Sequence, residues 1–249
     1  MKIDEYRQTL RASKNWEPYL LKHSGLPGPR GNIELGQAVA DEGDKALFSQ
    51  FISLDVKTAP VNSPQEFLVF CGTVGFGKLL AEGDASALKV LRRQASDPRW
   101  RTREGVAMAL QRLGDVDMDA LVQAMRVWSK GNLLEQRAAI AALCEPRLLT
   151  EKKHAAAVLD ILDTVTRSLA RIKERKSDEF LALKKGLAYC WSVAVAAYPQ
   201  EGKAAIEKWF ASNDREVIWI MKENLKKNRL ARMDAAWVKK WSTRLSKPA

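Results

Sequence analysis

Lysine, arginine and tryptophan side chains gather toward the carboxyl end of this 249-residue chain, where they form its most promising group for chemistry. Residues 171–249 carry 18 basic and 9 acidic side chains, whereas residues 1–170 carry 23 and 21. The last third therefore supplies most of the net charge of +11. Such a basic surface attracts polyanions, because lysine and arginine displace counterions when they neutralise phosphates.

A helix predicted over residues 215–227 would order part of this basic region. Val217, Met221 and Leu225 recur at helical spacing, which predicts a buried stripe. Basic side chains on the other faces would neutralise phosphates, and an exposed tryptophan would stack on a base. The candidate nucleic-acid-binding residues are Trp219, Lys222, Lys226, Lys227, Arg229, Arg232, Lys239, Lys240 and Arg244.

Other interpretations of the same residues stay open. Trp237 and Trp241 lie one helical turn apart and could belong to the core, with lysine stems covering Trp219. The basic residues would then form only a solvated surface. Contact with an anionic membrane surface is a further alternative.

Residues 72–79 (GTVGFGKL) match the GxxxxGK spacing of a phosphate-binding P-loop. A P-loop needs Ser or Thr after the lysine to hold magnesium, and Leu79 cannot coordinate a metal. Leu68, Cys71 and Gly75 recur at helical spacing, which places the segment inside a helix. There the glycines would permit close helix packing at a cost of about 1 kcal/mol each.

The cysteine and histidine residues form no pattern of metal ligands or nucleophiles. Cys71, Cys144 and Cys190 each stand alone in an apolar helical segment, and the two histidines are His23 and His154. Isolated buried cysteines behave as small hydrophobic residues and suit a reducing compartment. We expect no metal, no cofactor and no Cys/His or Ser/His/Asp catalytic group.

Helix-start signals recur along the middle of the chain. Ser63-Pro64 and Asp97-Pro98 combine a capping side chain with a proline, 34 residues apart, and Asn132 follows 35 residues later. Gly83-Asp84 and Gly114-Asp115 would end the first helix of each unit, because glycine readily takes the left-handed conformation. These signals predict a two-helix repeat of about 34 residues.

The flanking regions are also predicted to be helical, and no stretch shows the alternation of apolar and polar residues that is typical of a strand. Helices near residues 3–22 and 33–53 would flank a Gly/Pro-rich loop at residues 24–31. Caps or breaks are expected at Thr150, Ser177, Pro199, Asp214, Asn228 and Asp234. The corresponding helices are predicted at residues 151–173, 178–197, 201–211, 215–227 and 234–245. No apolar run approaches the ~18 residues of a membrane helix, the longest being residues 187–198.

Residues 97–107 (DPRWRTREGVA), with Leu110 and Gly114-Asp115, resemble a HEAT repeat. The resemblance is closest over residues 63–145, extends to residues 178–230 and is weak before residue 60. It implies an all-α fold, an α-solenoid of helix pairs in a right-handed superhelix. The expected organisation is an N-terminal helical segment, residues 1–60, followed by one repeat array, residues 61–249.

The chain is also similar, in size, helical repeats, basic character and tryptophan content, to the HEAT-like alkylpurine DNA glycosylases. In that family a cleft lined by tryptophan and a carboxylate holds a cationic damaged base. The characteristic paired-tryptophan segment has no match here, so no catalytic residue carries over. Trp100 alone has a carboxylate one turn on, at Glu104.

The leading expectation is a non-catalytic HEAT-like binding module that contacts DNA or another polyanion through its basic last third. A glycosylase acting on alkylated bases and a protein–protein scaffold are the alternatives. A charged amino terminus without the apolar core of a signal peptide favours the cytoplasm. We expect a monomer with no membrane contact, and a protein partner remains open.

Overall fold

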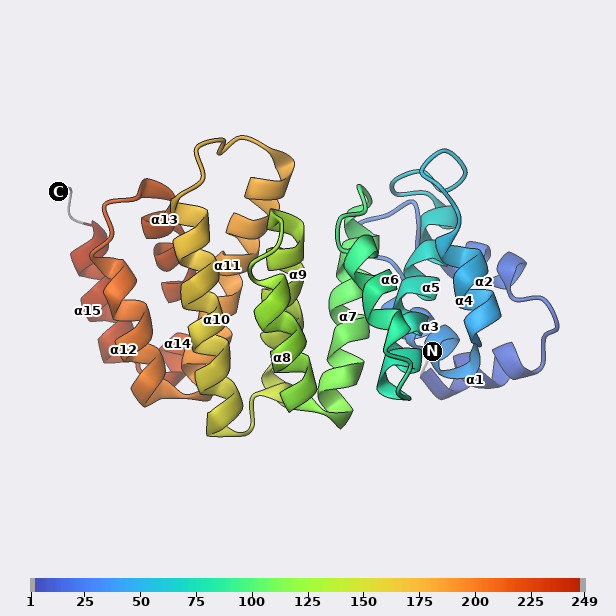
Figure 1. Ribbon diagram of the computed structural model, residues 1–249, viewed down its shortest axis with the longest axis horizontal. Helices are drawn as coiled ribbons and strands as arrows, with labels where there is room; N and C mark the ends of the chain where they lie inside the picture. Colours follow the sequence, from blue (N-terminus) through green and yellow to red (C-terminus); the bar gives the residue numbers. More distant parts are fainter. Residues whose placement is uncertain (1–2, 247–249) are drawn as a thin grey trace. The chain divides into compact units, whose positions relative to one another are not determined.

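The computed structural model, which describes residues 3–246, is built from helices. It contains fifteen α-helices and one short 3-10 turn, and these residues include no strand (Figure 1). The all-α prediction is confirmed. The helices divide into two compact units, unit 1 (Met1–Asp117) and unit 2 (Met118–Ala249).

Each unit has its own set of helices. Unit 1 contains α1 (Ile3–Arg11), α2 (Glu17–His23), α3 (Ile33–Glu42), α4 (Lys45–Ile52), α5 (Pro64–Ala81), α6 (Ser86–Gln94) and α7 (Trp100–Val116). Unit 2 contains α8 (Met118–Trp128), α9 (Leu133–Leu143), the 3-10 turn η1 (Pro146–Leu148), α10 (Lys152–Ala170), α11 (Asp178–Ala197), α12 (Pro199–Phe210), α13 (Arg215–Leu225), α14 (Asn228–Met233) and α15 (Ala235–Ser246).

Helix α5 is the centre of unit 1 and packs against α2, α3, α4, α6 and α7. The GxxxxGK residues lie inside it, as predicted, so their backbone N–H groups are not free to cradle phosphate. A Cβ atom at Gly75 would overlap the ring of Phe48, and one at Gly77 would overlap the backbone of Ala109. Lys78 donates to the carbonyl oxygens of Asp41 and Gly43, 3.0 and 3.1 Å away. The motif therefore serves helix packing.

The start of α5 and the turn after it follow the sequence signals. The Ser63 hydroxyl accepts from the Glu66 backbone N–H at 3.3 Å, with Pro64 as the first helical residue. Gly83 has a φ of 101°, the left-handed conformation predicted for the residue after the helix. The predicted start and end of this helix are thus confirmed.

Two predicted boundaries of α7 are wrong. Asp97 does not cap the helix, because its carboxylate accepts from the backbone and guanidinium of Arg99, and the helix begins only at Trp100. Gly114-Asp115 does not end it, since α7 continues to Val116 and Gly114 is buried within it. The chain then turns through Asp117, whose φ of −149° is extended and needs no glycine.

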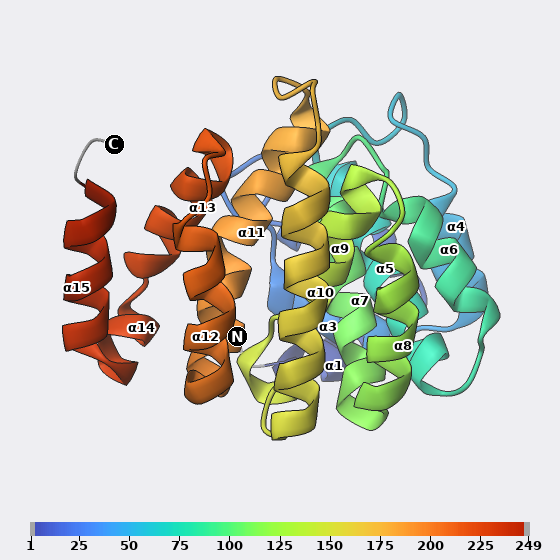
Figure 2. The same ribbon diagram turned by 60° about the vertical axis from the view of Figure 1, so that its left-hand side comes forward.

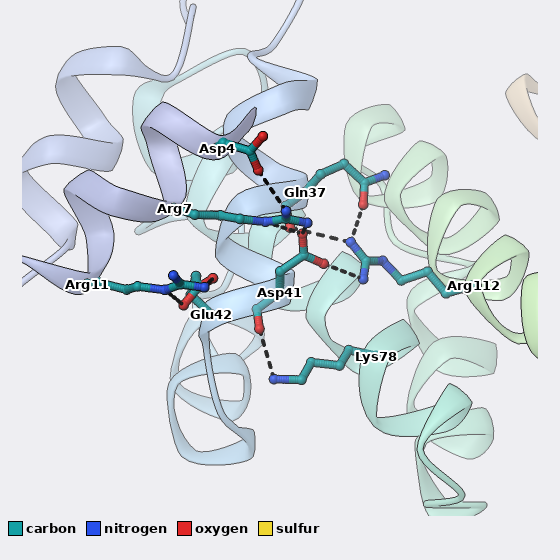
Figure 3. Close-up of polar contacts among 8 residues, drawn as sticks. All are labelled: Asp4, Arg7, Arg11, Gln37, Asp41, Glu42, Lys78 and Arg112. Atoms are coloured by element: carbon teal, nitrogen blue, oxygen red, sulfur yellow. Dashed lines mark hydrogen bonds and ion pairs between the residues drawn. The ribbon is translucent and has the colours of Figure 1, made fainter. Parts of the chain in front are cut away.

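A cluster of charged side chains fastens three helices of unit 1 to α3 (Figure 3). The Asp41 carboxylate, at the end of α3, accepts from Arg7 of α1 at 3.0 Å and from Arg112 of α7 at 2.7 Å. Lys78 of α5 binds the backbone oxygen of the same residue. Arg11 pairs with the neighbouring Glu42 at 2.6 Å. The Arg11 guanidinium lowers the pKa of Glu42.

The amino-terminal region is more divided than predicted. Residues 3–22 form α1 and α2 with a break between them, and residues 33–53 form α3 and α4. Asp44 accepts from the Leu47 backbone N–H at 2.9 Å and starts α4, a capping signal that the continuous prediction overlooks. Residue 60, the predicted domain boundary, lies within unit 1, where α3 and α4 pack on α5.

Unit 2 is built in two layers. Helices α8, α10 and α12 pack side by side in one layer, and α9, α11 and α13 pack in the other (Figures 1 and 2). Capping by Asn132, Ser177 and Asp214 starts α9, α11 and α13, as predicted. The chain breaks between Leu225 and Asn228, as predicted, and the short helix α14, which begins at Asn228, was not predicted.

Helix α11 has the predicted bounds, residues 178–197, but it is apolar over a longer stretch than expected. Among the described helices it alone has the length and composition to cross a membrane. The sequence predicts no apolar run longer than residues 187–198. However, 56% of its 18-residue apolar window is buried inside the protein. Its side chains, including the fully buried Trp191, pack against α9, α10, α12 and α13. We therefore interpret α11 as the core helix of unit 2.

Candidate functional site

An open groove in unit 2, here called the basic groove, contains four of the predicted basic residues. Its volume is about 650 Å³, and the described residues that line it include lysine and arginine but no carboxylate residue. Its floor is apolar, from the end of α11 and the turn η1. The lining residues are Pro146, Leu149, Val193, Ala196, Ala197, Lys226, Lys227, Asn228, Arg229 and Arg232.

A capping residue fixes the first turn of α13, the helix that precedes the basic residues of the groove. Asp214 accepts from the backbone N–H groups of Glu216 and Val217 at 2.9 and 3.1 Å, and Arg175 pairs with it at 2.7 Å. Burial raises the pKa of Asp214, but the Arg175 guanidinium and these N–H groups outweigh it, so the pKa is lowered. The cap therefore stays charged down to acidic pH.

A buried amide fastens the other end of α13 to α11. Asn224 is fully buried, its Oδ1 accepts from the Ser192 N–H at 2.8 Å, and its Nδ2 donates to the Leu187 carbonyl at 2.9 Å. Val217, Met221 and Leu225 are buried, so the predicted core stripe is confirmed. Lys226 and Lys227 come directly after this fixed segment, which holds their backbone at the rim of the groove.

Tyr189 of α11 adjoins the basic groove, since Lys227 and Arg229, which line the groove, lie against its ring. Its side chain is 44% exposed. The Arg229 guanidinium carbon lies 4.7 Å from the ring centroid and the Lys227 ammonium 5.9 Å, so both are in cation–π range. Arg229 also donates to the Tyr189 hydroxyl. An exposed ring with fixed cations is suited to bind an anion-bearing aromatic group.

Two further predicted residues lie on α13 before the groove. Trp219 is 37% exposed, and the Lys184 ammonium of α11 lies 4.1 Å from its ring centroid. A lysine does cover Trp219, but it comes from the adjacent helix and not from α13. Lys222 is half-buried on the same helix.

The predicted residues of α15 do not line the groove. Trp237 and Trp241 both donate from Nε1 to Oε1 of Glu207 on α12, at 2.6 and 3.0 Å, and Trp237 is buried. These rings therefore attach α15, as the core interpretation predicted. The basic residues on this helix, exposed on its surface, are Lys239, Lys240 and Arg244.

The sequence prediction missed Tyr189 and the apolar floor of the groove. Val193 and Ala196 lie within an apolar helix and carry no functional signal of their own. Tyr189 stands one turn after the exposed Lys185, a spacing that could have marked a solvent-facing stripe. Only the packing of α14 on α11 brings Arg229 to Tyr189.

A second hollow, in unit 1, brings together Trp100 and Glu104, the one tryptophan–carboxylate pair noted in the sequence. Its volume is about 250 Å³, and Phe67 and Phe70 form an apolar wall. The guanidinium carbon of Arg101, which also lines it, lies 4.5 Å from the Trp100 ring centroid. A cation therefore already occupies a face of this tryptophan.

The described residues contain no reactive thiol and no cluster of metal ligands. Cys71, Cys144 and Cys190 are free and buried, and burial raises the pKa of Cys71 and of Cys144. Within residues 3–246 no group of three or more His, Cys, Asp or Glu side chains could hold a metal ion.

No family model, curated protein sequence or solved structure matches this chain.

Proposed function

We propose that this protein is a HEAT-like binding module that contacts DNA or a related polyanion through the basic groove of unit 2. The observation that carries the proposal is the composition of the groove: Lys226, Lys227, Arg229 and Arg232 line it, and none of its described lining residues is a carboxylate. Phosphates that enter it would compete with Glu223 for Lys226, because these two residues pair at 2.5 Å, and would meet three further cations in Lys227, Arg229 and Arg232. Lysine offers a compact charge there, and arginine offers paired N–H donors.

The helix packing supports the HEAT-like part of the proposal. In a HEAT array, successive helix pairs stack so that first and second helices form separate layers. The alternation of α8, α10 and α12 with α9, α11 and α13 has this form within unit 2. In this arrangement the basic residues that come after α13 lie at one end of the layer formed by the second helices.

Binding to DNA at two salt concentrations tests this function. Affinity for duplex DNA should fall steeply between about 50 and about 200 mM salt, since bound phosphates release counterions. The groove variant Lys226→Ala/Lys227→Ala/Arg232→Ala should bind more than ten-fold more weakly. Its salt slope should be smaller by about 0.9 for each phosphate that the variant no longer neutralises.

A matched variant separates a local site from general charge. Lys239→Ala/Lys240→Ala/Arg244→Ala removes the same number of positive charges from α15, outside the groove. It should bind DNA nearly as well as the unmodified protein. Equal losses in the two triple variants would show diffuse attraction by the basic end of the chain, and no binding by any of the proteins would favour a scaffold that binds another protein.

A second candidate function is base excision, supported by Trp100 and Glu104 lining one hollow. The Arg101 guanidinium on Trp100 opposes a cationic base there, so this candidate ranks below the binding module. It predicts release of free base from alkylated DNA, abolished in Glu104→Gln. Absence of release at high protein concentration would eliminate it.

A further inference from the structure

Two exposed aromatic rings adjoin the positive charges of unit 2. Tyr189 and Trp219 are 44% and 37% exposed, and they are the most exposed tyrosine, tryptophan or phenylalanine side chains in the described part of this unit. Exposure of large rings carries a cost, because apolar surface remains in water. A ligand that stacks on the rings would remove that surface from water.

Both rings are held in the same way. Arg229 lies against Tyr189 and donates to its hydroxyl, and Lys184 lies against Trp219. Lys184 is itself fixed by an ion pair with Glu216. Each ring thus has a cation on it and a substantial surface that faces solvent, so it is positioned before any ligand arrives.

The two rings lie on neighbouring helices that run in the same direction. Lys184 contacts Glu216, and further along both helices Leu187 contacts Asn224. Tyr189 is five residues beyond Lys184, the residue that covers Trp219. At about 1.5 Å per residue, the Cα atoms of Lys184 and Tyr189 are about 7–8 Å apart along the axis of α11.

Two rings on separate helices, each with surface open to solvent, favour unpaired bases. In a duplex, bases stack at about 3.4 Å per strand and cover one another, so their faces are not accessible to side chains. A single strand can separate its bases and place each on an aromatic ring, while its backbone follows the positive charges. The cations beside the rings are Lys184, Lys227 and Arg229.

We propose that the basic groove and the adjoining faces of α11 and α13 bind single-stranded nucleic acid, with Tyr189 and Trp219 stacking on unpaired bases. The inference rests on the proposed function and narrows the ligand from a polyanion to single-stranded nucleic acid. The phosphates enter the basic groove beside Lys227 and Arg229, and the bases lie against the two rings.

Fluorescence anisotropy with an oligothymidylate of about 16 nucleotides, and with a duplex of the same length, tests the inference. The single strand should bind more tightly than the duplex at equal salt. Tyr189→Ala and Trp219→Ala should each weaken single-strand binding by about 5- to 100-fold, with little effect on the duplex. Tyr189→Phe should retain most of the affinity, because it keeps the ring.

Val127→Ala is the control, since it trims another exposed apolar side chain of unit 2, on α8. Thermal melting should show that all variants remain folded. Tighter binding of the duplex, or unchanged single-strand affinity in both ring variants, would overturn the inference. The proposed function would survive that result if the groove variant still bound duplex more weakly, and both would fall if neither nucleic acid bound.

Discussion

Arg112 on α7 pairs with Asp41 at the end of α3 at 2.7 Å, although 71 residues separate them in the chain. Both side chains are 20% exposed, and Arg7 reaches the same carboxylate from α1. Asp41 thus joins two guanidinium groups in a partly buried position, and Arg7 has a second carboxylate partner in the exposed Asp4, at 3.0 Å. Removal of the Asp41 charge should cost more than the loss of a surface ion pair, because Arg112 would lose its carboxylate partner beside a second guanidinium group.

Asp41→Asn should lower the free energy of unfolding by about 1–3 kcal/mol. Urea denaturation followed by circular dichroism would measure the change. Glu34→Gln is the control, because it breaks the exposed pair with Arg30 at 3.5 Å and should change stability by less than about 1 kcal/mol. Equal effects of the two substitutions would contradict a special role for Asp41.

The close approach of α5 and α7 makes a second prediction. A Cβ atom at Gly77 would lie 2.5 Å from the carbonyl oxygen of Ala109, and backbone cannot move aside as a side chain can. Gly77→Ala should destabilise the protein by about 1–3 kcal/mol, despite the better helix propensity of alanine. The same urea denaturation would measure the change.

Gly186→Ala provides the contrast within a helix of unit 2. There the nearest atom to a new Cβ is the terminal Cδ1 of Ile140, at 3.3 Å, which a small rotation can move. The helical preference of alanine should then leave stability unchanged or slightly raised. A harmless Gly77→Ala would mean that α5 and α7 are less closely packed than described.

Helix caps illustrate how much of the fold the sequence could predict. Caps that bind their own helix, such as Ser63 and Asn132, are local, so spacing and residue type were sufficient. Asp97 failed as a cap because Arg99 competes for its carboxylate, and that side chain also reaches the carbonyl of Leu54, 45 residues away. Such competition depends on the folded chain and cannot be inferred from spacing.

The candidate site likewise combines features that the local sequence predicts with features that depend on the folded chain. Charge asymmetry in the sequence located the basic region, and four of the nine predicted residues line one groove. The sequence did not indicate that α15 would turn Trp237 and Trp241 toward Glu207. Nor did it indicate Tyr189, because the hydrogen bond that joins its hydroxyl to Arg229 spans 40 positions of the chain.

The titration of Asp84 offers a prediction about pH. Hydrogen bonds from Lys45 and Ser86 lower the pKa of this carboxyl group from 3.8 to about 2. Because the folded pKa lies below the unfolded one, the stabilisation is complete well above pH 3.8 and is lost as the pH falls toward 2. An NMR titration of the carboxyl carbon should show this midpoint.

Lys45→Met should raise the pKa of Asp84 toward its ordinary value, because the ammonium group at 2.8 Å is the first cause of the shift. Ser86 keeps its hydrogen bonds in that variant, so the recovery should be partial. An unchanged midpoint would show that Lys45 does not pair with Asp84 in solution.

The buried thiols provide a prediction about reactivity. Burial raises the pKa of Cys71 and Cys144, and the thiolate is the reactive form. Iodoacetamide at mildly alkaline pH should therefore modify neither residue in the folded protein, and both after denaturation. Mass spectrometry of peptides would locate the label. Rapid modification of Cys144 in the folded state would mean that solvent reaches it.

The contact between Gly75 and Phe48 restricts which substitutions the sequence can accept during evolution. The ring occupies the space that any side chain at position 75 would need, so the two positions cannot change independently. In related proteins, an alanine or serine at position 75 should accompany a smaller residue at position 48. Gly75, the middle glycine of the motif that resembles a P-loop, would then vary together with Phe48 in α4, as paired substitutions across one contact between two helices.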